Sequence, residues 1–160
     1  MTRPAALAQV IFLAAWLGAV VFFGAFVAPA AFASLPTRSL AGAVVGRILP
    51  ALFVAGMGVG VLLAVTSLVG HKALGRAVLG GALVMSCAIS HLVVGAGISS
   101  LREVIGPSLD ALSPDDPRRA TFGQLHALSV AGLGVGTLAA VLALWLAVAA
   151  VRRDDYRRTV

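Results

Sequence analysis

Charge is what this sequence has least of. Asp, Glu, Lys and Arg together make up 11% of its 160 residues, whereas 60% of the residues are hydrophobic. Soluble domains carry about a quarter charged residues, so this composition excludes an ordinary soluble fold and indicates a membrane domain. The few charges fall in clusters, and four long runs without Asp, Glu, Lys or Arg lie between them: Pro4–Thr37, Ile48–Gly70, Ala77–Leu101 and Ala120–Val151.

Several kinds of active site are also missing. No Asp, Glu, Lys or Arg falls in the central part of an uncharged run, which argues against a proton antiporter built on intramembrane carboxylates. The chain has no phosphate-binding loop, no Gly-x-Ser-x-Gly elbow and no paired-cysteine metal motif, so we expect no enzymatic activity. Cys87 is the single cysteine and forms no internal disulfide, so cysteine usage does not indicate a redox compartment.

What is present is enough apolar length for four crossings. Each run reaches the roughly 20 residues that a helix needs to cross about 30 Å of hydrocarbon. The sequence therefore predicts an all-α, integral membrane four-helix bundle with up-down-up-down topology, forming one domain over residues 1–160. The expected helices cover about residues 7–32, 49–69, 74–100 and 122–151, with an outward loop at 101–121.

A repeated glycine-rich phrase marks the second and fourth crossings. Residues 54–65 and 130–141 agree at nine of twelve positions, 76 residues apart, which raises the hypothesis of a duplicated two-helix hairpin. Small residues at i,i+4 spacing let helix backbones approach in lipid. We therefore expect these two helices to touch, within the bundle or between protomers, through Gly56, Gly58, Gly60, Gly132, Gly134 and Gly136.

Basic residues predict the orientation. With four crossings, both termini lie on the same side of the membrane as the 70–76 turn. The segments on that side together hold seven Lys and Arg, against five on the other side. The positive-inside rule therefore places both termini in the cytoplasm and the protein in the inner membrane. The net charge of +6 then reflects topology and contact with anionic lipid, and does not indicate nucleic-acid binding.

The N-terminus has a competing interpretation as a secretory signal peptide. Arg3 precedes the first apolar run, and Ala31-Phe32-Ala33 resembles a small-residue cleavage site. The run is nearly twice as long as the about 7–15 residues of a signal core. We therefore expect it to remain as the first crossing.

Proline and aspartate mark the expected loops. A loop at residues 33–47 should begin with a helix break at Pro29 or Pro36. In the longer outward loop, Asp116 is expected to cap the fourth helix and Pro117 to be its first residue. The 70–76 turn is short enough to pair the second and third helices as a hairpin.

Cys87 and His91 are the first candidate ligands. They lie one helical turn apart on the third crossing, and a thiolate with an imidazole suits copper(I), zinc or mercury(II). The alternative is that His91 hydrogen-bonds across the bundle to a hydroxyl or a backbone carbonyl. Two ligands do not complete a site, so a soft metal is a hypothesis.

His126 is the second candidate, near the outer end of the fourth crossing. Together with Ser129, Arg102 and Arg47 it is expected to form one polar cluster at the outer face, which would be the mouth of any solute or metal path. The alternative is an interfacial histidine that anchors the outward loop. A haem iron clamped between His91 and His126 is a minor hypothesis, because their expected depths differ on a rise of about 1.5 Å per residue.

Several motifs resemble those of a known family. They are Trp16-x-Gly18, Phe22-Phe23, Ala28-Pro29-x-x-Phe32, Ala41-Gly42, Leu101-Arg102 and Phe122-x-x-Leu125-His126-x-Leu128-Ser129. On these the chain resembles a bacterial membrane family of unknown function related to human transmembrane protein 205 and, more distantly, copper-resistance membrane domains. Relatives often carry Asn where this chain has Leu133. The resemblance implies four membrane helices and a relative associated with resistance to a platinum drug.

Two classes of function follow. The first is transport of, or resistance to, a soft metal or a small solute, based on Cys87, His91 and His126 and on the resemblance. The second is a non-catalytic accessory or structural subunit of a larger membrane complex, based on the glycine-rich faces and the lack of intramembrane charge. The lipid bilayer is the expected partner in both, and a homo-oligomer is compatible with either.

Overall fold

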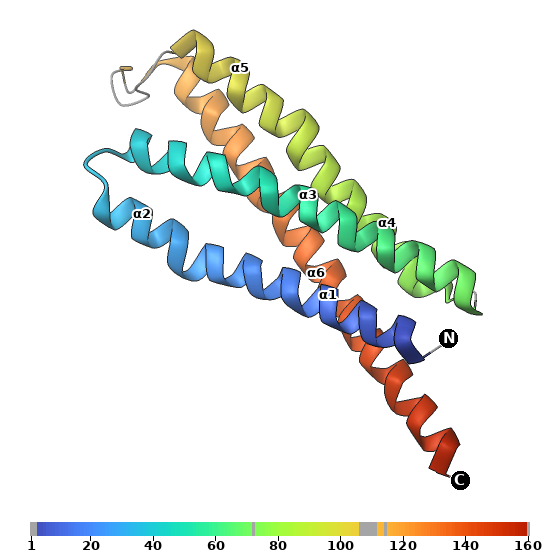
Figure 1. The fold of residues 1–160 in the computed structure, drawn as a ribbon. Coiled ribbons are helices and arrows are strands. Elements are labelled where there is room, and N and C mark those ends of the chain that lie inside the picture. The colour runs from blue at the N-terminus through green and yellow to red at the C-terminus, as the bar shows by residue number, and fades with distance from the viewer. Residues whose placement is uncertain (1–2, 72, 106–111, 114, 160) are drawn as a thin grey trace.

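The computed structural model describes residues 3–71, 73–105, 112–113 and 115–159, and these form four long helical rods (Figure 1). The predicted all-α four-helix bundle is confirmed, because four apolar helices are each long enough to cross a membrane. Rods one and three are interrupted helices, whereas rods two and four are continuous. The elements are α1 (Arg3–Phe22), η1 (Phe23–Val27), α2 (Ala28–Ser34), α3 (Arg38–His71), α4 (Leu74–Ala88), η2 (Ile89–Val94), α5 (Gly95–Ile105) and α6 (Pro117–Thr159).

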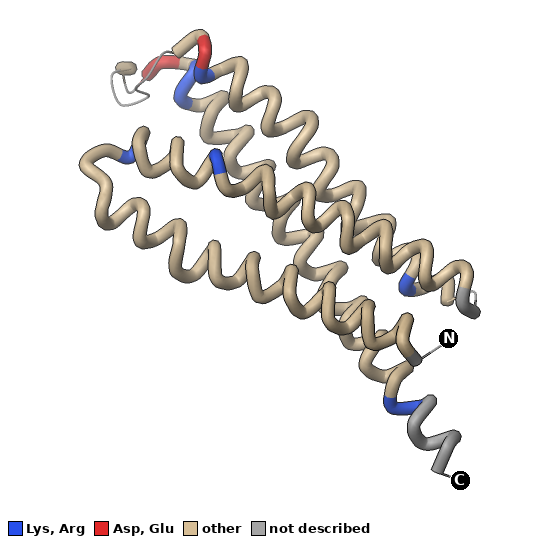
Figure 2. The backbone as a smooth tube through the Cα atoms, in the orientation of Figure 1, with Lys and Arg blue, Asp and Glu red and all other residues tan. Residues whose placement is uncertain are grey.

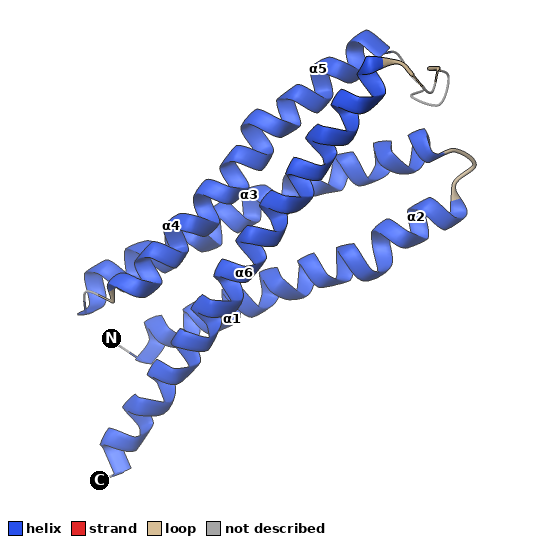
Figure 3. Ribbon diagram, turned by 180° about the vertical axis from the view of Figure 1, so that it is seen from behind, coloured by secondary structure: helices blue, strands red, loops and turns tan. Residues whose placement is uncertain are grey.

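The rods run up, down, up and down (Figures 1 and 3). Rod one packs against rods two and four, and rod three packs against the same two rods, so α3 and α6 lie diagonally across the bundle. We call the end with the turn at residues 35–37 and the start of α6 the loop end. The terminal end holds both chain termini and the link between α3 and α4.

The surface of the bundle is apolar along its length. Large side chains such as Phe12, Val21, Leu92 and Trp145 are more than half exposed, which a monomeric soluble protein rarely tolerates over so wide an area. The described charged residues gather at the two ends of the bundle (Figure 2). This distribution is that of a bundle whose sides contact lipid and whose ends contact water.

The helices extend beyond the predicted membrane spans. The second begins at Arg38 instead of Leu49, so most of the expected 33–47 loop is helix and Pro50 lies inside it. The fourth begins at Pro117 and continues to Thr159. Uncharged runs locate the part of a helix that lies in hydrocarbon, but a helix continues into water wherever no residue breaks it. Residues 106–111 of the expected outward loop lie outside the described residues.

Of the two prolines at which a helix break was expected, the break occurs at Pro36. The chain turns at residues 35–37, beside Pro36, whereas Pro29 lies inside α2. Proline has no backbone N–H and disrupts the normal i→i−4 pattern. The wider π-helical turn of η1 precedes it, and the Ala28 N–H bonds to the Phe23 carbonyl. This local π geometry accommodates Pro29 without breaking the rod.

The core lies in the middle of the bundle. Leu13 and Trp16 from α1 meet Phe53 and Leu63 from α3, and the indole N–H of Trp16 donates to the Leu52 carbonyl at 2.9 Å. Small residues of α6 allow the rods to approach closely, because alanines 139, 140, 143 and 147 are at most 5% exposed. The remaining buried members of this cluster are Val20, Leu83 and Cys87.

The glycines contact other helices than expected. Gly60 of α3 lies against Gly80 and Val84 of α4, and Gly136 of α6 lies against Leu83 and Ser86 of the same helix. The predicted direct contact between the second and fourth crossings within the bundle is therefore wrong, because these rods are diagonal and the third lies between them. Gly58 and Gly134 face outward, with open space beside them.

The glycines of the two repeated segments, residues 54–65 and 130–141, nevertheless face the same directions relative to the bundle interior. Gly56 and Gly132 both face the interior, where an added Cβ would overlap Cys87 and Ser90 respectively. In each phrase the central glycine faces outward and its two neighbours face inward. This follows from the 3.6-residue period of a helix and does not by itself establish the duplication.

Candidate functional site

A pocket of about 540 Å³ opens among α2, α3, α5 and α6 at the loop end. Its volume is in the range of small-molecule sites, which are mostly apolar with a few convergent polar groups. The polar side chains in its lining are Arg38, Ser39, Arg102, Arg119, His126 and Ser129. The others are Phe32, Gly42, Ala43, Val45, Gly46, Leu49, Ile98, Ile105 and Phe122.

The structure brings three of the four expected cluster residues into this pocket. Arg102, His126 and Ser129 all line it, although His126 is itself exposed; Arg47 is also exposed and does not line the pocket. Arg47 was therefore the wrong basic residue of α3, because it points about 100° away from its neighbour Gly46 around the helix. Arg38, nine residues earlier in the same helix, lines the pocket instead.

Arg102 is held in place by glycine and by an aromatic ring. A Cβ on Gly42 would lie 3.4 Å from Nη2 of Arg102, and one on Gly46 would lie 3.4 Å from Nη1. The guanidinium carbon lies 5.6 Å from the ring centroid of Phe122, a cation–π distance. The guanidinium of the half-buried Arg102 thus lies between α3 and α6, where larger side chains at Gly42 and Gly46 would crowd it.

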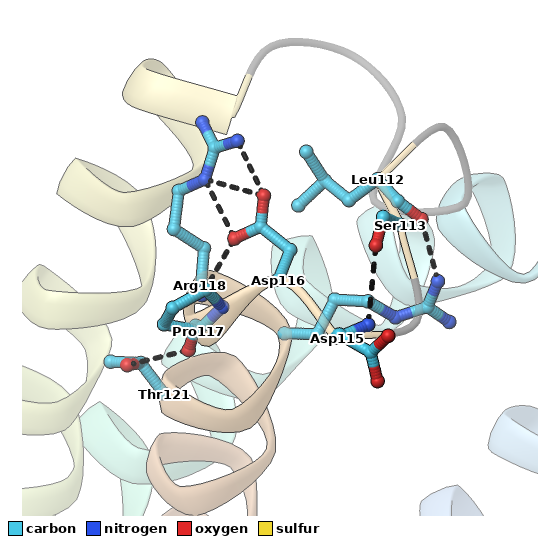
Figure 4. A network of polar contacts seen from close by, with 8 residues as sticks. Leu112, Ser113, Asp115, Asp116, Pro117, Arg118 and Thr121 are labelled. Carbon is cyan, nitrogen blue, oxygen red and sulfur yellow. Dashed lines mark hydrogen bonds and ion pairs between the residues drawn. The ribbon is translucent and has the colours of Figure 1, made fainter.

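The start of α6 contributes Arg119 and Phe122 to the pocket lining, so we call it the rim of the pocket. Polar contacts stabilise it (Figure 4). Asp116 caps the helix as expected, with Oδ1 accepting from the Arg118 backbone N–H at 2.9 Å, and Pro117 is the first helical residue. The Arg118 side chain pairs with the same carboxylate and holds the pKa of Asp116 down at about 2. Arg119 donates to the Leu112 carbonyl at 2.9 Å and so ties the preceding segment to the rim.

The lining is positively charged. Arg38, Arg102 and Arg119 line the pocket, and none of its lining residues is acidic. Asp116 is already paired with Arg118, which does not line the pocket. A cleft walled by low-dielectric groups and charges of one sign concentrates the electrostatic field, which here attracts anions.

The sequence contained a signal for the residues that were missed. Arg38, Gly42 and Gly46 follow one another at intervals of four, so they lie on one stripe of a helix. The interpretation of residues 33–47 as a loop concealed this stripe. Extending the helix to Arg38 would have identified the face that receives Arg102.

Cys87 and His91 lie elsewhere. Cys87 is 1% exposed, and its sulfur packs at the point where Trp16 meets Gly56. His91 is half-buried in the π-helical segment η2, and neither residue lines the pocket. Over the described residues, no three His, Cys, Asp or Glu side chains lie close enough together to hold a metal ion.

A second polar cluster lies at the terminal end and was not expected. Gln9 is 1% exposed; its amide nitrogen donates to Thr66 Oγ1 at 2.6 Å and to Ser67 Oγ at 3.3 Å. Its amide oxygen accepts from Arg76 Nη1 at 3.4 Å. Arg76, which the sequence analysis counted in the 70–76 turn, lies in α4 and is only 8% exposed. This network joins α1, α3 and α4 below the apolar core.

Comparison with known families identifies the chain's relatives. The model of a domain of unknown function, DUF4149, matches residues 11–106, which is more than half of the chain. The chain belongs to this family. The DUF4149 match covers most of the first three rods and ends before α6, so the Phe122–Ser129 segment lies outside it. No curated protein and no solved structure matches the chain significantly.

The pocket joins the DUF4149 region to α6. Arg38 and Arg102 lie within the matched residues, whereas Arg119, His126 and Ser129 lie beyond them. Binding in this pocket would therefore require α6 as well as the part of the chain that the family model describes.

Proposed function

We propose that this small multi-pass membrane protein binds a small solute in the loop-end pocket and serves in transport of, or resistance to, that solute. The observation that carries the proposal is the pocket itself, whose mostly apolar lining includes Arg102, His126 and Ser129. We also propose that the protein is not an enzyme. The resemblance to the family of human transmembrane protein 205 supports a role in resistance.

The proposed setting is the inner membrane with both termini in the cytoplasm. The seven-to-five distribution of basic residues supports this orientation. The pocket would then open toward the outer face. The apolar core around Leu13, Leu63 and Leu83 lies between the pocket and the Gln9 network, so passage of a solute would require the rods to rearrange.

A small solute is favoured over a soft metal. Cys87 is packed against Trp16 and Gly56, and His126 lines a pocket that already carries three arginines. Positive charges disfavour a metal cation there. Haem is disfavoured because His91 does not line the pocket that includes His126. Metal analysis and an absorption spectrum of the purified protein test both alternatives, and stoichiometric metal or a Soret band would reverse this preference.

The test of solute handling compares two arginine variants. Cells that lack the protein are complemented with wild type, Arg102→Gln or Arg47→Gln at equal expression, and their sensitivity to a panel of toxic small solutes is measured. We expect at least one solute for which wild type and Arg47→Gln protect and Arg102→Gln does not. Equal protection by both variants, or no protection across the panel by wild type, would count against the proposal.

The second candidate is an accessory subunit. Gly58 and Gly134 face outward from α3 and α6 with no neighbour, and outward small residues give a partner helix room for close approach in lipid. Gly58→Leu and Gly134→Leu should then abolish copurification with a larger complex without lowering the stability of the bundle. Purification of the wild type without any partner from mild detergent would remove this candidate.

A further inference from the structure

We infer that the ligand of the loop-end pocket is an oxyanion attached to an apolar body, that is, an amphiphilic phosphate, carboxylate or sulfonate. The inference rests on the proposed function and narrows it to a class of ligand. Two sources share this chemistry: the headgroup region of an anionic lipid, and a free amphiphilic acid.

Charge is the first argument. Arg38, Arg102 and Arg119 line one pocket whose lining holds no carboxylate; Arg38 is exposed, whereas Arg102 and Arg119 are half-buried. Like charges in a partly desolvated cleft repel one another, and each prefers an anion nearby. A bound oxyanion would relieve this repulsion, whereas a cationic ligand would add to it.

The free donors of Arg102 are the second argument. Among the described residues this half-buried side chain makes a cation–π contact with Phe122 and has no hydrogen-bond acceptor or ion pair. Guanidinium offers five N–H donors in a planar fork that matches two oxygens of a carboxylate or phosphate. Gly42, Gly46 and Phe122 hold the group in position, which lowers the entropy lost on binding.

The walls are the third argument. The apolar lining includes Phe32, Leu49, Ile98, Ile105 and Phe122, so a fully hydrated inorganic ion would leave much of the surface without a matching contact. Ser129 is 5% exposed and adds a hydroxyl at the lining. An anionic head near Arg102 with an apolar body along these side chains satisfies both parts of the pocket.

The test measures occupancy at the pocket itself. Ala43, which lines the pocket, is replaced by Cys in a Cys87→Ala background, and its rate of labelling by N-ethylmaleimide is followed in neutral maltoside micelles. The probes are octyl phosphate, octyltrimethylammonium and octyl glucoside, which share one tail. We expect octyl phosphate alone to slow labelling and also to raise the melting temperature of the unmodified protein.

Arginine variants assign the effect. Arg102→Gln should weaken protection by octyl phosphate by about tenfold or more, since a charge-assisted hydrogen bond is lost. Arg102→Lys keeps the charge but not the fork, so it should fall between Arg102→Gln and wild type. Arg47→Gln removes an exposed arginine from the same end of the molecule and should change protection by less than about twofold. Circular dichroism confirms that each variant is folded.

The outcomes separate the inference from the function on which it rests. If octyl glucoside or octyltrimethylammonium protects as well as octyl phosphate, the pocket binds solutes but the anionic class is wrong. If no probe protects the cysteine or raises the melting temperature, both the inference and solute binding fail. If a few molecules of phosphatidylglycerol per protein also protect the cysteine, the ligand is an anionic lipid. If octyl phosphate protects the cysteine and phosphatidylglycerol does not, the ligand is a free amphiphilic acid.

Discussion

The backbones of Gly60 and Gly80 touch where α3 crosses α4. A Cβ on Gly60 would lie 2.8 Å from the Gly80 carbonyl oxygen, and a Cβ on Gly80 would lie 2.7 Å from the Gly60 carbonyl oxygen. Neither helix can carry even a methyl group at this crossing without moving apart. The α3–α4 hairpin therefore depends on this pair for its close approach, as small residues do elsewhere in membrane bundles.

Gly60→Ala should consequently destabilise the bundle by about 1–3 kcal/mol through overpacking, measured as a lower melting temperature in detergent. Gly58→Ala is the matched control two residues away, because nothing lies within 4 Å of the added methyl group. It should leave the melting temperature unchanged or slightly raised, since alanine is the better helix former. Equal effects of the two substitutions would show that Gly60 is not a contact residue.

The Gln9 network should be a second source of stability. Gln9→Ala removes the amide that joins Thr66, Ser67 and Arg76 and leaves buried polar groups with fewer partners, at a cost of about 1–3 kcal/mol. Gln124→Ala changes the other, exposed glutamine and should alter stability by less than about 0.5 kcal/mol. Urea or thermal unfolding in detergent compares them; similar values would argue against a structural network.

The sequence predicted what depends on local chemistry and length. Four runs of sufficient apolar length become four rods, and Asp116 followed by Pro117 becomes a helix cap, because a capping carboxylate needs only its own backbone neighbours. The hairpin between α3 and α4 likewise follows from a linker too short for any other path. Each of these features is decided within a few residues of the chain.

What the sequence did not predict depends on how the rods are rotated and ordered. Gly60 and Gly136 were expected to pack toward each other, yet both face the third rod. The sequence of a single helix does not determine the order of the four helices around the bundle. Arg76 was assigned to the 70–76 turn, and its burial was not predicted because its partner Gln9 lies 67 positions away in the sequence. Similarly, choosing Arg38 over Arg47 required knowing which face of α3 meets Arg102.

The Asp116 cap gives a pH-dependent prediction. The folded state lowers the pKa of this carboxyl group from 3.8 to about 2 through its bonds to Arg118, so the charged form stabilises the folded state. That contribution is fully present above pH 3.8 and is lost as the pH falls toward 2. Wild type should therefore melt above Asp116→Asn at pH 5–7, and the difference should shrink between about pH 4 and pH 2.

The control for this titration is Asp115→Asn. Asp115 is exposed, and its side chain makes no hydrogen bond or ion pair with the described residues, so its replacement should not change the melting temperature at any pH in the series. A difference between wild type and Asp116→Asn that persists unchanged at pH 2 would mean that the cap does not depend on the charge of the carboxylate.

The last prediction concerns which side of the membrane the pocket faces. Because the rods alternate, both termini lie at one end of the bundle and the start of α6 lies at the other. The distribution of basic residues predicts that the termini lie in the cytoplasm. In a Cys87→Ser background, Ser113→Cys should react with a membrane-impermeant thiol reagent in intact cells. Thr159→Cys should react only after the cells are permeabilised, which also controls for accessibility. The reverse pattern would place the pocket at the cytoplasmic face, so that its anion would come from the cell interior or the inner leaflet.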